Sequence, residues 1–147
     1  MTQPEKPINI LLAEDNPNDR RLVEIALEES GLQASLGVVD NGEKLMQYLR
    51  REGEYANANL PDLILLDLIM PRKGGLEALN EIKDHPELRE IPVFVFTSLA
   101  ENEDISNISD HNVEMYIHKS ADFDGMVEVL RSVGEFWYLR TSANRPS

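Results

Sequence analysis

Cysteine is absent from the 147 residues of this chain, so no disulfide bond can form. The chain also lacks any run approaching the roughly 20 apolar residues that a membrane-spanning helix needs, and residues 1–7 lack the apolar core of an export signal. A formal net charge of −13, uninterrupted by a basic stripe, disfavours binding to nucleic acid, which is itself a polyanion. We therefore expect a cytoplasmic protein that binds neither membrane nor nucleic acid.

What the chain does contain is typical of one globular domain, with 41% apolar and 28% charged residues. We predict a disordered segment over residues 1–7, a single domain over residues 8–139 and a flexible tail over residues 140–147. No output domain is expected after the last helix. A signal would therefore leave this domain through contacts with other proteins.

Short apolar runs alternate five times with amphipathic stretches, which indicates an α/β fold with a parallel sheet and crossover helices. The expected strands span residues 8–13, 34–39, 63–66, 92–97 and 113–118. The expected helices span residues 17–30, 42–52, 75–84, 101–109 and 122–139. The first helix shows Leu22, Ile25 and Ala26 on its apolar face, whereas residues 101–109 are acidic and give the weakest helical pattern.

Polar side chains stand at the ends of four predicted strands. They are Glu14 and Asp15 after the first strand, Asp67 after the third, Thr97 at the end of the fourth and Lys119 after the fifth. The carboxyl ends of parallel strands meet at one edge of an open sheet, so we expect these side chains to lie close together. Neighbouring carboxylates repel one another unless a cation lies between them, and Mg²⁺ suits a few oxygen ligands with several waters. The pattern predicts a Mg²⁺ site.

The same side chains suit a phosphoryl group. An ammonium group and a hydroxyl group, here on Lys119 and Thr97, can neutralise and hydrogen-bond phosphoryl oxygens. A carboxylate can attack phosphorus and become an aspartyl phosphate, so Asp67 is the predicted phosphoacceptor. Taken singly, Asp67 could instead cap a helix, Glu14 and Asp15 could be helix-terminal acids, and the other two could be ordinary surface residues. Their common position at the carboxyl ends of the predicted strands favours a functional role for the set.

These residues resemble the receiver domains of two-component response regulators, over residues 8–139. The resemblance rests on Glu14-Asp15, on Asp67-Leu-Ile-Met-Pro-x-x-Gly-Gly, on Thr97-Ser98 and on Tyr116-x-x-Lys119. It implies a flavodoxin-like, doubly wound (βα)5 sheet with strand order 2-1-3-4-5. It also implies that a sensor histidine kinase transfers a phosphoryl group to this chain.

The resemblance further implies roles for individual residues. Mg²⁺ would be held by Asp15, by Asp67 and by the backbone carbonyl of Ile69, with Glu14 acting through a water molecule. Thr97 and Lys119 would bind the phosphoryl oxygens. Tyr116 would be the aromatic switch residue whose rotamer follows Thr97.

A narrower resemblance is to the small response regulators of cyanobacterial phytochromes. It rests on Glu-Asp-Asn-Pro-x-Asp from position 14, on His-Pro-Glu-Leu-Arg-Glu-Ile-Pro from position 85, on Lys119-Ser120 and on Phe136-Trp137. It implies a light-sensing phytochrome as the kinase, and a homodimer through a face that includes Phe136, Trp137 and Tyr138. The alternative is that this end of the last helix packs on its own core. The downstream partner is not identified.

Three departures from the receiver pattern bear on function. Gly74 replaces a common aspartate, which removes a helix-capping acid. Ser120 stands where many receivers have a proline after a cis peptide, and a cis bond before a non-proline residue costs about 3 kcal/mol, so the geometry of this peptide stays open. Ile69 and Leu99 would flank the path of the hydrolytic water without activating it, so we expect slow loss of the phosphoryl group.

Other classes of function fit less well. A phosphatase of the haloacid dehalogenase type needs a second acid two residues after its aspartate, where Ile69 stands, so we do not expect an enzyme. An FMN carrier needs a phosphate loop rich in glycine and hydroxyl groups after the first strand, where Glu14 and Asp15 stand. A docking module that takes no phosphate is disfavoured by the complete set of acids, threonine and lysine.

Overall fold

The computed structural model describes residues 8–68, 70, 72–97, 115–118 and 123–143. Its centre is a parallel sheet of five strands in the order β2-β1-β3-β4-β5, the order that the resemblance to receiver domains implies. The strands are β1 (Ile8–Ala13), β2 (Ala34–Val39), β3 (Leu63–Leu66), β4 (Val93–Thr97) and β5 (Met115–His118). Of the predicted elements, the helix at 101–109 and strand residues 113–114 lie outside the described residues.

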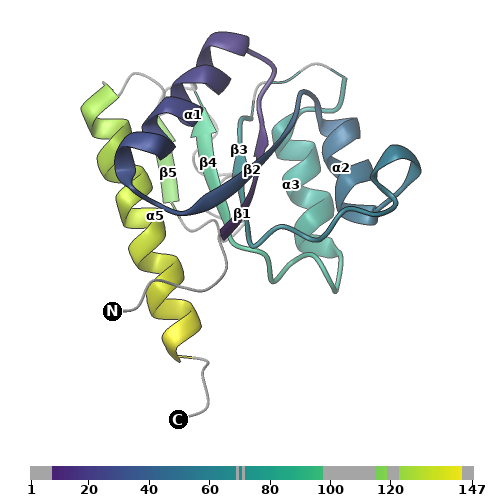
Figure 1. Cartoon of the computed structure of the whole chain (residues 1–147). Helices are drawn as coiled ribbons and strands as arrows, with labels where there is room; N and C mark the ends of the chain where they lie inside the picture. The colour runs from purple at the N-terminus through teal and green to yellow at the C-terminus, as the bar shows by residue number, and fades with distance from the viewer. Residues whose placement is uncertain (1–7, 69, 71, 98–114, 119–122, 144–147) are drawn as a thin grey trace.

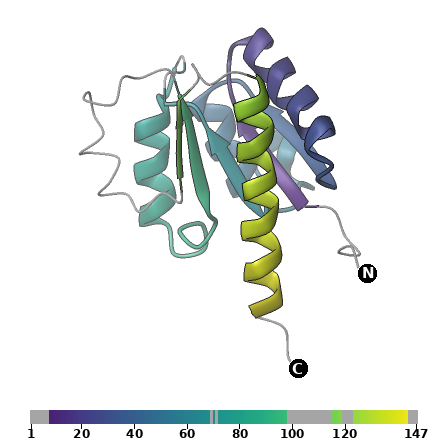
Figure 2. The ribbon, with the colours of Figure 1, turned by 90° about the vertical axis from the view of Figure 1, so that its left-hand side faces the viewer.

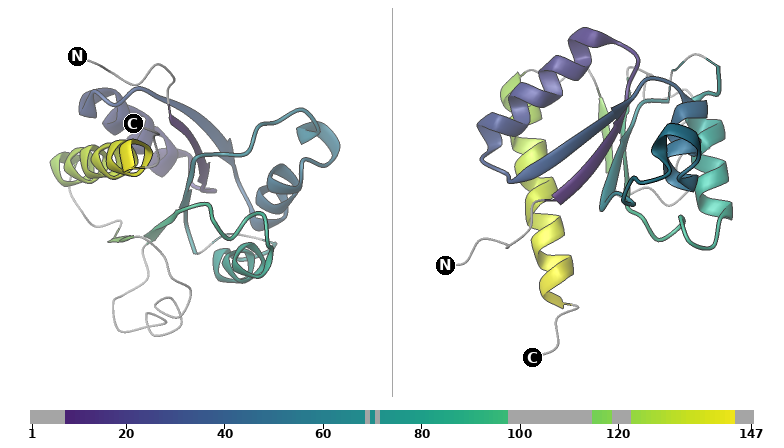
Figure 3. Two further views of the ribbon diagram at one scale, coloured as in Figure 1. Left: turned by 90° about the horizontal axis from the view of Figure 1, so that it is seen from below. Right: turned by 45° about the vertical axis from the view of Figure 1, so that its right-hand side comes forward.

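Helices cover both faces of the sheet. α1 (Pro17–Ser30) and α5 (Phe123–Ala143) lie on one face, and α2 (Gly42–Arg50) and α3 (Gly75–Asp84) lie on the other, as Figure 1 and Figure 3 show. Two cores result, one on each face. β3 contributes to both, because Leu63 and Leu65 face α1 and α5 whereas Ile64 and Leu66 face α2 and α3. This double burial explains why the strand is continuously apolar.

Local signals define α1 at both ends. The Asn16 side chain accepts hydrogen bonds from the backbone N–H groups of Asn18 and Asp19, at 2.9 and 3.1 Å. Pro17 occupies the first turn, where its missing N–H costs nothing. Gly31 ends the helix in the left-handed conformation, with φ of 75°.

The buried face of α1 differs from the predicted one. The buried residues are Val23, Ala26 and Leu27, whereas Leu22 is 41% exposed. The prediction of Leu22 as an inward residue was therefore wrong. The helix packs against α5 as well as against the sheet. These two contacts determine which side of the helix is buried, and that side begins at Val23.

Other element boundaries differ by a few residues. α2 ends at Arg50 because Arg51 is left-handed, and a short 3₁₀ turn, η1 (Gly53–Tyr55), follows in the predicted loop. β4 begins at Val93 rather than at residue 92. α5 continues to Ala143, so residues 140–143 are helical where a flexible tail was predicted. Figure 2 shows that the last turns of α5 project beyond the sheet. None of the described helices is long and apolar enough to span a membrane.

Candidate functional site

The register of β1 and β3 brings their carboxyl ends together. Ala13 lies opposite Leu66, so the next residues, Glu14 and Asp67, leave the sheet side by side. The backbone N–H of Asp67 donates to the carbonyl of Ala13 at 3.0 Å. One carboxylate oxygen from each of Glu14, Asp15 and Asp67 lies within 4.8 Å of the others. The structure therefore brings these three predicted acids into one cluster.

Two of these acids are buried. Glu14 is 0% exposed and Asp67 is 2% exposed, whereas Asp15 faces solvent. One Glu14 oxygen accepts a hydrogen bond from the backbone N–H of Asn16 at 3.1 Å, which ties the acid to the start of α1. Negative groups packed so closely and away from water need a compensating cation, and hard oxygen donors suit Mg²⁺ or Mn²⁺. The donor set fits a divalent metal.

Glycines close the loop after Asp67 against α3. The Gly75 N–H donates to the Leu68 carbonyl at 3.1 Å. A Cβ atom on Gly75 would lie less than 3.0 Å from the Asp67 carbonyl oxygen. In the same way, a Cβ on Gly42 would lie less than 3.0 Å from the carbonyl oxygen of Lys73, to which the Gly42 N–H donates at 3.0 Å. These close approaches were not predicted, although two glycines after Asp67 were visible in the sequence.

The remaining predicted site residues are described in part or not at all. Thr97 ends β4, the strand next to β3, so its backbone lies at the same edge of the sheet as Asp67. The side chains of Thr97, Tyr116 and Tyr138 are outside what the structure describes, as are Ile69 and Lys119 entirely. Their predicted roles stay predictions.

The predicted dimer residues pack in part against their own chain. The ring of Phe136 meets that of Phe94 edge to face, with centroids 5.5 Å apart. Phe136 and Trp137 are both half-buried against the core beneath α1 and α5. The alternative expectation, a helix end packed on its own core, therefore accounts for part of this surface.

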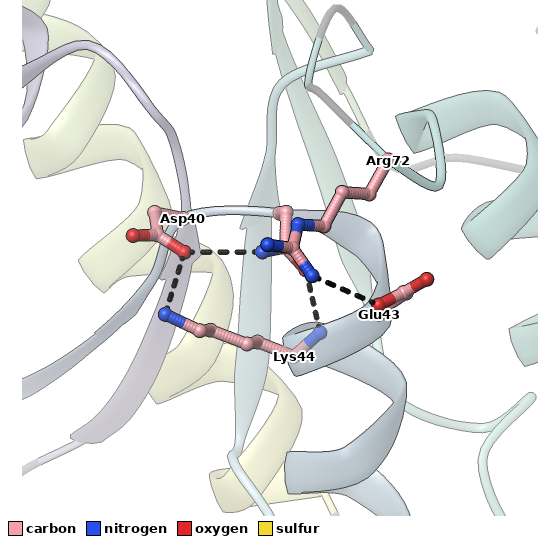
Figure 4. Close-up of polar contacts among 5 residues, drawn as sticks. Asp40, Glu43, Lys44 and Arg72 are labelled. Atoms are coloured by element: carbon pink, nitrogen blue, oxygen red, sulfur yellow. Dashed lines mark hydrogen bonds and ion pairs between the residues drawn. The ribbon is translucent and has the colours of Figure 1, made fainter.

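An open cavity of about 460 Å³ lies beside the acidic cluster and shares Asp15 with it. It is lined by Asp15, Asp40, Asn41, Glu43, Lys44, Gln47 and Arg72. Figure 4 shows Arg72 reaching from the loop after β3 towards Glu43 in the first turn of α2. No functional role was predicted from the sequence for residues 40–42 or for Arg72.

A family model described as the response regulator receiver domain matches residues 10–131. Response regulator Rcp1 of Synechocystis sp. is 37% identical over 131 residues, which are 89% of each chain. A probable methanogenesis regulatory protein, FilR2, of Methanothrix harundinacea is 32% identical and covers 90% of this chain and 85% of its own.

Solved structures give the same result. The phosphorylated cyanobacterial phytochrome response regulator RcpA is 43% identical and covers 97% of this chain and all of its own, with a TM-score of 0.83. The Mn²⁺-bound form of Rcp1 is 37% identical and covers 89% of this chain and 94% of its own, with a TM-score of 0.80. Receiver domains are generally signalling modules rather than enzymes, and they bind Mg²⁺ or Mn²⁺ at an acidic pocket. Because the family model and these relatives cover most of the chain, the chain belongs to the response regulator receiver family.

Proposed function

We propose that Asp67 accepts a phosphoryl group from the phosphohistidine of a sensor histidine kinase. The observation that carries this proposal is the position of Asp67, which is 2% exposed at the end of β3 and within 4.8 Å of the acids Glu14 and Asp15. A buried carboxylate among other carboxylates lowers the stability of the fold, whereas with a bound metal it is a suitable nucleophile towards phosphorus.

The metal would be Mg²⁺, held by Asp15, by Asp67 and by the backbone carbonyl of residue 69, with Glu14 acting through water. The chemistry of the three clustered carboxylates supports this set. The Mn²⁺-bound form of Rcp1 supports it from a relative. When bound, the metal would neutralise charge on the carboxylates and on the phosphoryl oxygens.

In the transfer step, a carboxylate oxygen of Asp67 forms the new bond to phosphorus while the bond from phosphorus to the imidazole nitrogen breaks. The electron pair goes to the departing nitrogen, and the ring, already protonated on its other nitrogen, leaves as neutral imidazole. The backbone of Asp67 is held by its hydrogen bond to Ala13, so the carboxylate is presented from a fixed strand end. Thr97 and Lys119 would bind the phosphoryl oxygens.

The output would be a shift between two conformations of the chain. The phosphoryl group would draw in Thr97, and Tyr116 would follow it, because the group interacts differently with the two states. Loss of the group is expected to be slow, and the time course of label loss measures this.

We further propose a phytochrome-type kinase as the phosphodonor and a homodimer through the outer surface of α5, with an unidentified downstream protein. Support comes from the relatives, which include the phytochrome response regulator RcpA and the bacteriophytochrome response regulator RtBRR, 35% identical. The projecting end of α5, seen in Figure 2, offers a surface beyond the sheet.

Labelling with acetyl phosphate and Mg²⁺ tests the phosphoacceptor. We expect the mass to increase by one phosphoryl group, located on Asp67 by peptide mapping, and no increase in Asp67→Asn. Asp84→Asn is the matched control, because Asp84 ends α3 at the opposite edge of the sheet and has the same chemistry. Labelling that persists in Asp67→Asn would refute the assignment, and an unlabelled wild type would favour a docking module that takes no phosphate.

A further inference from the structure

The cavity beside the acidic cluster is placed to receive part of a phosphodonor. Its wall includes Asp15, whose carboxylate lies within 4.8 Å of that of Asp67. A volume of about 460 Å³ is ample for a small organic phosphate. A molecule whose phosphorus is in reach of Asp67 can therefore extend its leaving group into this space.

The two cations that line the cavity differ in how firmly they are held. Lys44 lies 3.1 Å from a carboxylate oxygen of Asp40, and Asn41 donates to the same oxygen at 3.3 Å. The Asn41 side chain also accepts from the Lys44 backbone N–H at 2.8 Å, so this corner forms a connected network, drawn in Figure 4. Moving the Lys44 ammonium to a ligand would break its contact with Asp40 at 3.1 Å, whereas the two Asn41 hydrogen bonds would remain.

Arg72 is held more loosely. Its guanidinium lies 3.6 Å from a carboxylate oxygen of Glu43, and the two side chains are 68% and 53% exposed. An exposed pair at this distance contributes about 0–1 kcal/mol. The guanidinium can therefore exchange Glu43 for an anion that enters the cavity, at little cost in free energy.

The backbone at Arg72 is nevertheless well anchored. Arg72 has a φ of 65°, a conformation that is uncommon for a residue with a side chain. The next residue, Lys73, is fixed by an ion pair to Glu81 and by its carbonyl contact with Gly42. The turn thus directs a long cationic side chain, which helps line the cavity, towards Glu43 of α2, as Figure 4 shows.

Taking Asp67 as the phosphoacceptor, we propose that Arg72 binds the leaving group of acyl phosphate donors in this cavity. In that reaction an oxygen of Asp67 bonds to phosphorus, the bond from phosphorus to the acyl oxygen breaks, and the acyl group departs as a carboxylate with the electron pair. Negative charge develops on the departing oxygens, and a guanidinium can hold both of them. A nitrogen leaving group departs neutral and gains nothing from Arg72.

The test compares acetyl phosphate with phosphoramidate, whose leaving group is ammonia. Phosphorylation rates of Asp67 are measured with each donor at saturating Mg²⁺ in wild type, Arg72→Gln and Arg89→Gln. Arg89 precedes β4 at the opposite edge of the sheet and is exposed, so it controls for the change in charge. We expect Arg72→Gln to lower the ratio of the acetyl phosphate rate to the phosphoramidate rate about tenfold, as loss of one charge-assisted hydrogen bond predicts.

Two further variants refine the result. Glu43→Gln removes the competing partner of Arg72, so the ratio should rise. Arg72→Lys keeps the charge without the two-pronged guanidinium, so its ratio should lie between those of wild type and Arg72→Gln, and it supplies the test if Arg72→Gln does not fold. The lower ratio of the acetyl phosphate rate to the phosphoramidate rate in Arg72→Gln should persist at about 0.5 M salt, where exposed charges that are not in contact are screened.

The inference would be overturned if Arg72→Gln left the ratio of the two phosphorylation rates unchanged, or if its lower ratio returned to the wild-type value at high salt. An equal fall of the ratio in Arg89→Gln would also overturn it. Failure of the proposed function is distinguishable, because the wild type would then take the label on Asp67 from neither donor.

Discussion

Gly75 lies where the first turn of α3 comes closest to the backbone of the phosphoacceptor candidate. Its N–H donates a hydrogen bond to the Leu68 carbonyl, and there is no room for a side chain between α3 and the backbone of Asp67. Gly74, one residue earlier, adopts a φ of −72°, and a Cβ atom added there would lie 3.8 Å from its nearest neighbour, the Leu68 carbonyl oxygen. Two adjacent glycines therefore differ in what they tolerate.

Gly75→Ala should destabilise the protein by about 2–3 kcal/mol, because the added methyl group must displace backbone rather than a flexible side chain. Gly74→Ala should cost only about 0.5 kcal/mol, the difference expected between the two residues at a helix N-cap. Urea unfolding at constant m-value measures both. Gly75→Ala should also slow phosphorylation of Asp67, since the Asp67 carbonyl is the atom displaced. Equal costs for the two variants would contradict this account.

At the scale of elements, Lys73 joins the loop after β3 to α2 and α3. Its ammonium nitrogen lies 2.6 Å from both oxygens of Glu81, and these side chains are only 20% and 34% exposed. Its carbonyl accepts from Gly42 at the start of α2. Arg50 of α2 lies 3.9 Å from the same glutamate. The loop that carries the predicted metal-binding carbonyl is thereby tied to both helices on this face.

A double-mutant cycle of Lys73→Met and Glu81→Gln should give a coupling free energy of about 1 kcal/mol, because both charges are partly withdrawn from water. The exposed pair Arg21 and Glu24, three residues apart on α1, is the matched comparison and should give about 0.3 kcal/mol. Urea unfolding of the four chains in each cycle measures both values. If the coupling free energy of Lys73 and Glu81 were no larger than that of Arg21 and Glu24, the Lys73–Glu81 ion pair would not be what fixes the loop after β3.

At the scale of the whole molecule, α5 is the element that extends beyond the sheet. Its buried stripe, which includes Met126, Leu130 and Val133, packs on the core, and its final residues run to Ala143. Figure 2 shows these last turns standing clear of the sheet. A second copy of the chain could pack against them.

We expect the full chain to be a dimer by light scattering and a chain that ends at Trp137 to be a monomer, because the truncation removes Tyr138 of the predicted dimer face and the projecting turns after it. Leu22→Ser is the control, since it removes an exposed apolar side chain from α1 instead. A truncated chain that stays dimeric, or association lost in Leu22→Ser, would place the interface elsewhere. Repeating the measurement after acetyl phosphate shows whether phosphorylation makes or breaks the dimer.

Much of the fold and of the acidic site followed from the sequence, because the signals concerned are local. Continuous apolar runs define strands that are buried on both faces, and Asn16, Pro17 and Gly31 mark the ends of α1 through their own backbone chemistry. Glu14 and Asp67 directly follow strands. Once the strands are parallel neighbours, these acids must meet at one edge.

Tertiary structure alone decided the features that depend on distances between remote segments. The face that α1 buries is set by its contact with α5, which favours Val23 over Leu22. The contact of Gly42 with Lys73 joins two loops far apart in sequence. The cavity that connects Asp15 with Arg72 exists only once these loops have met, since no local pattern encodes the space between them.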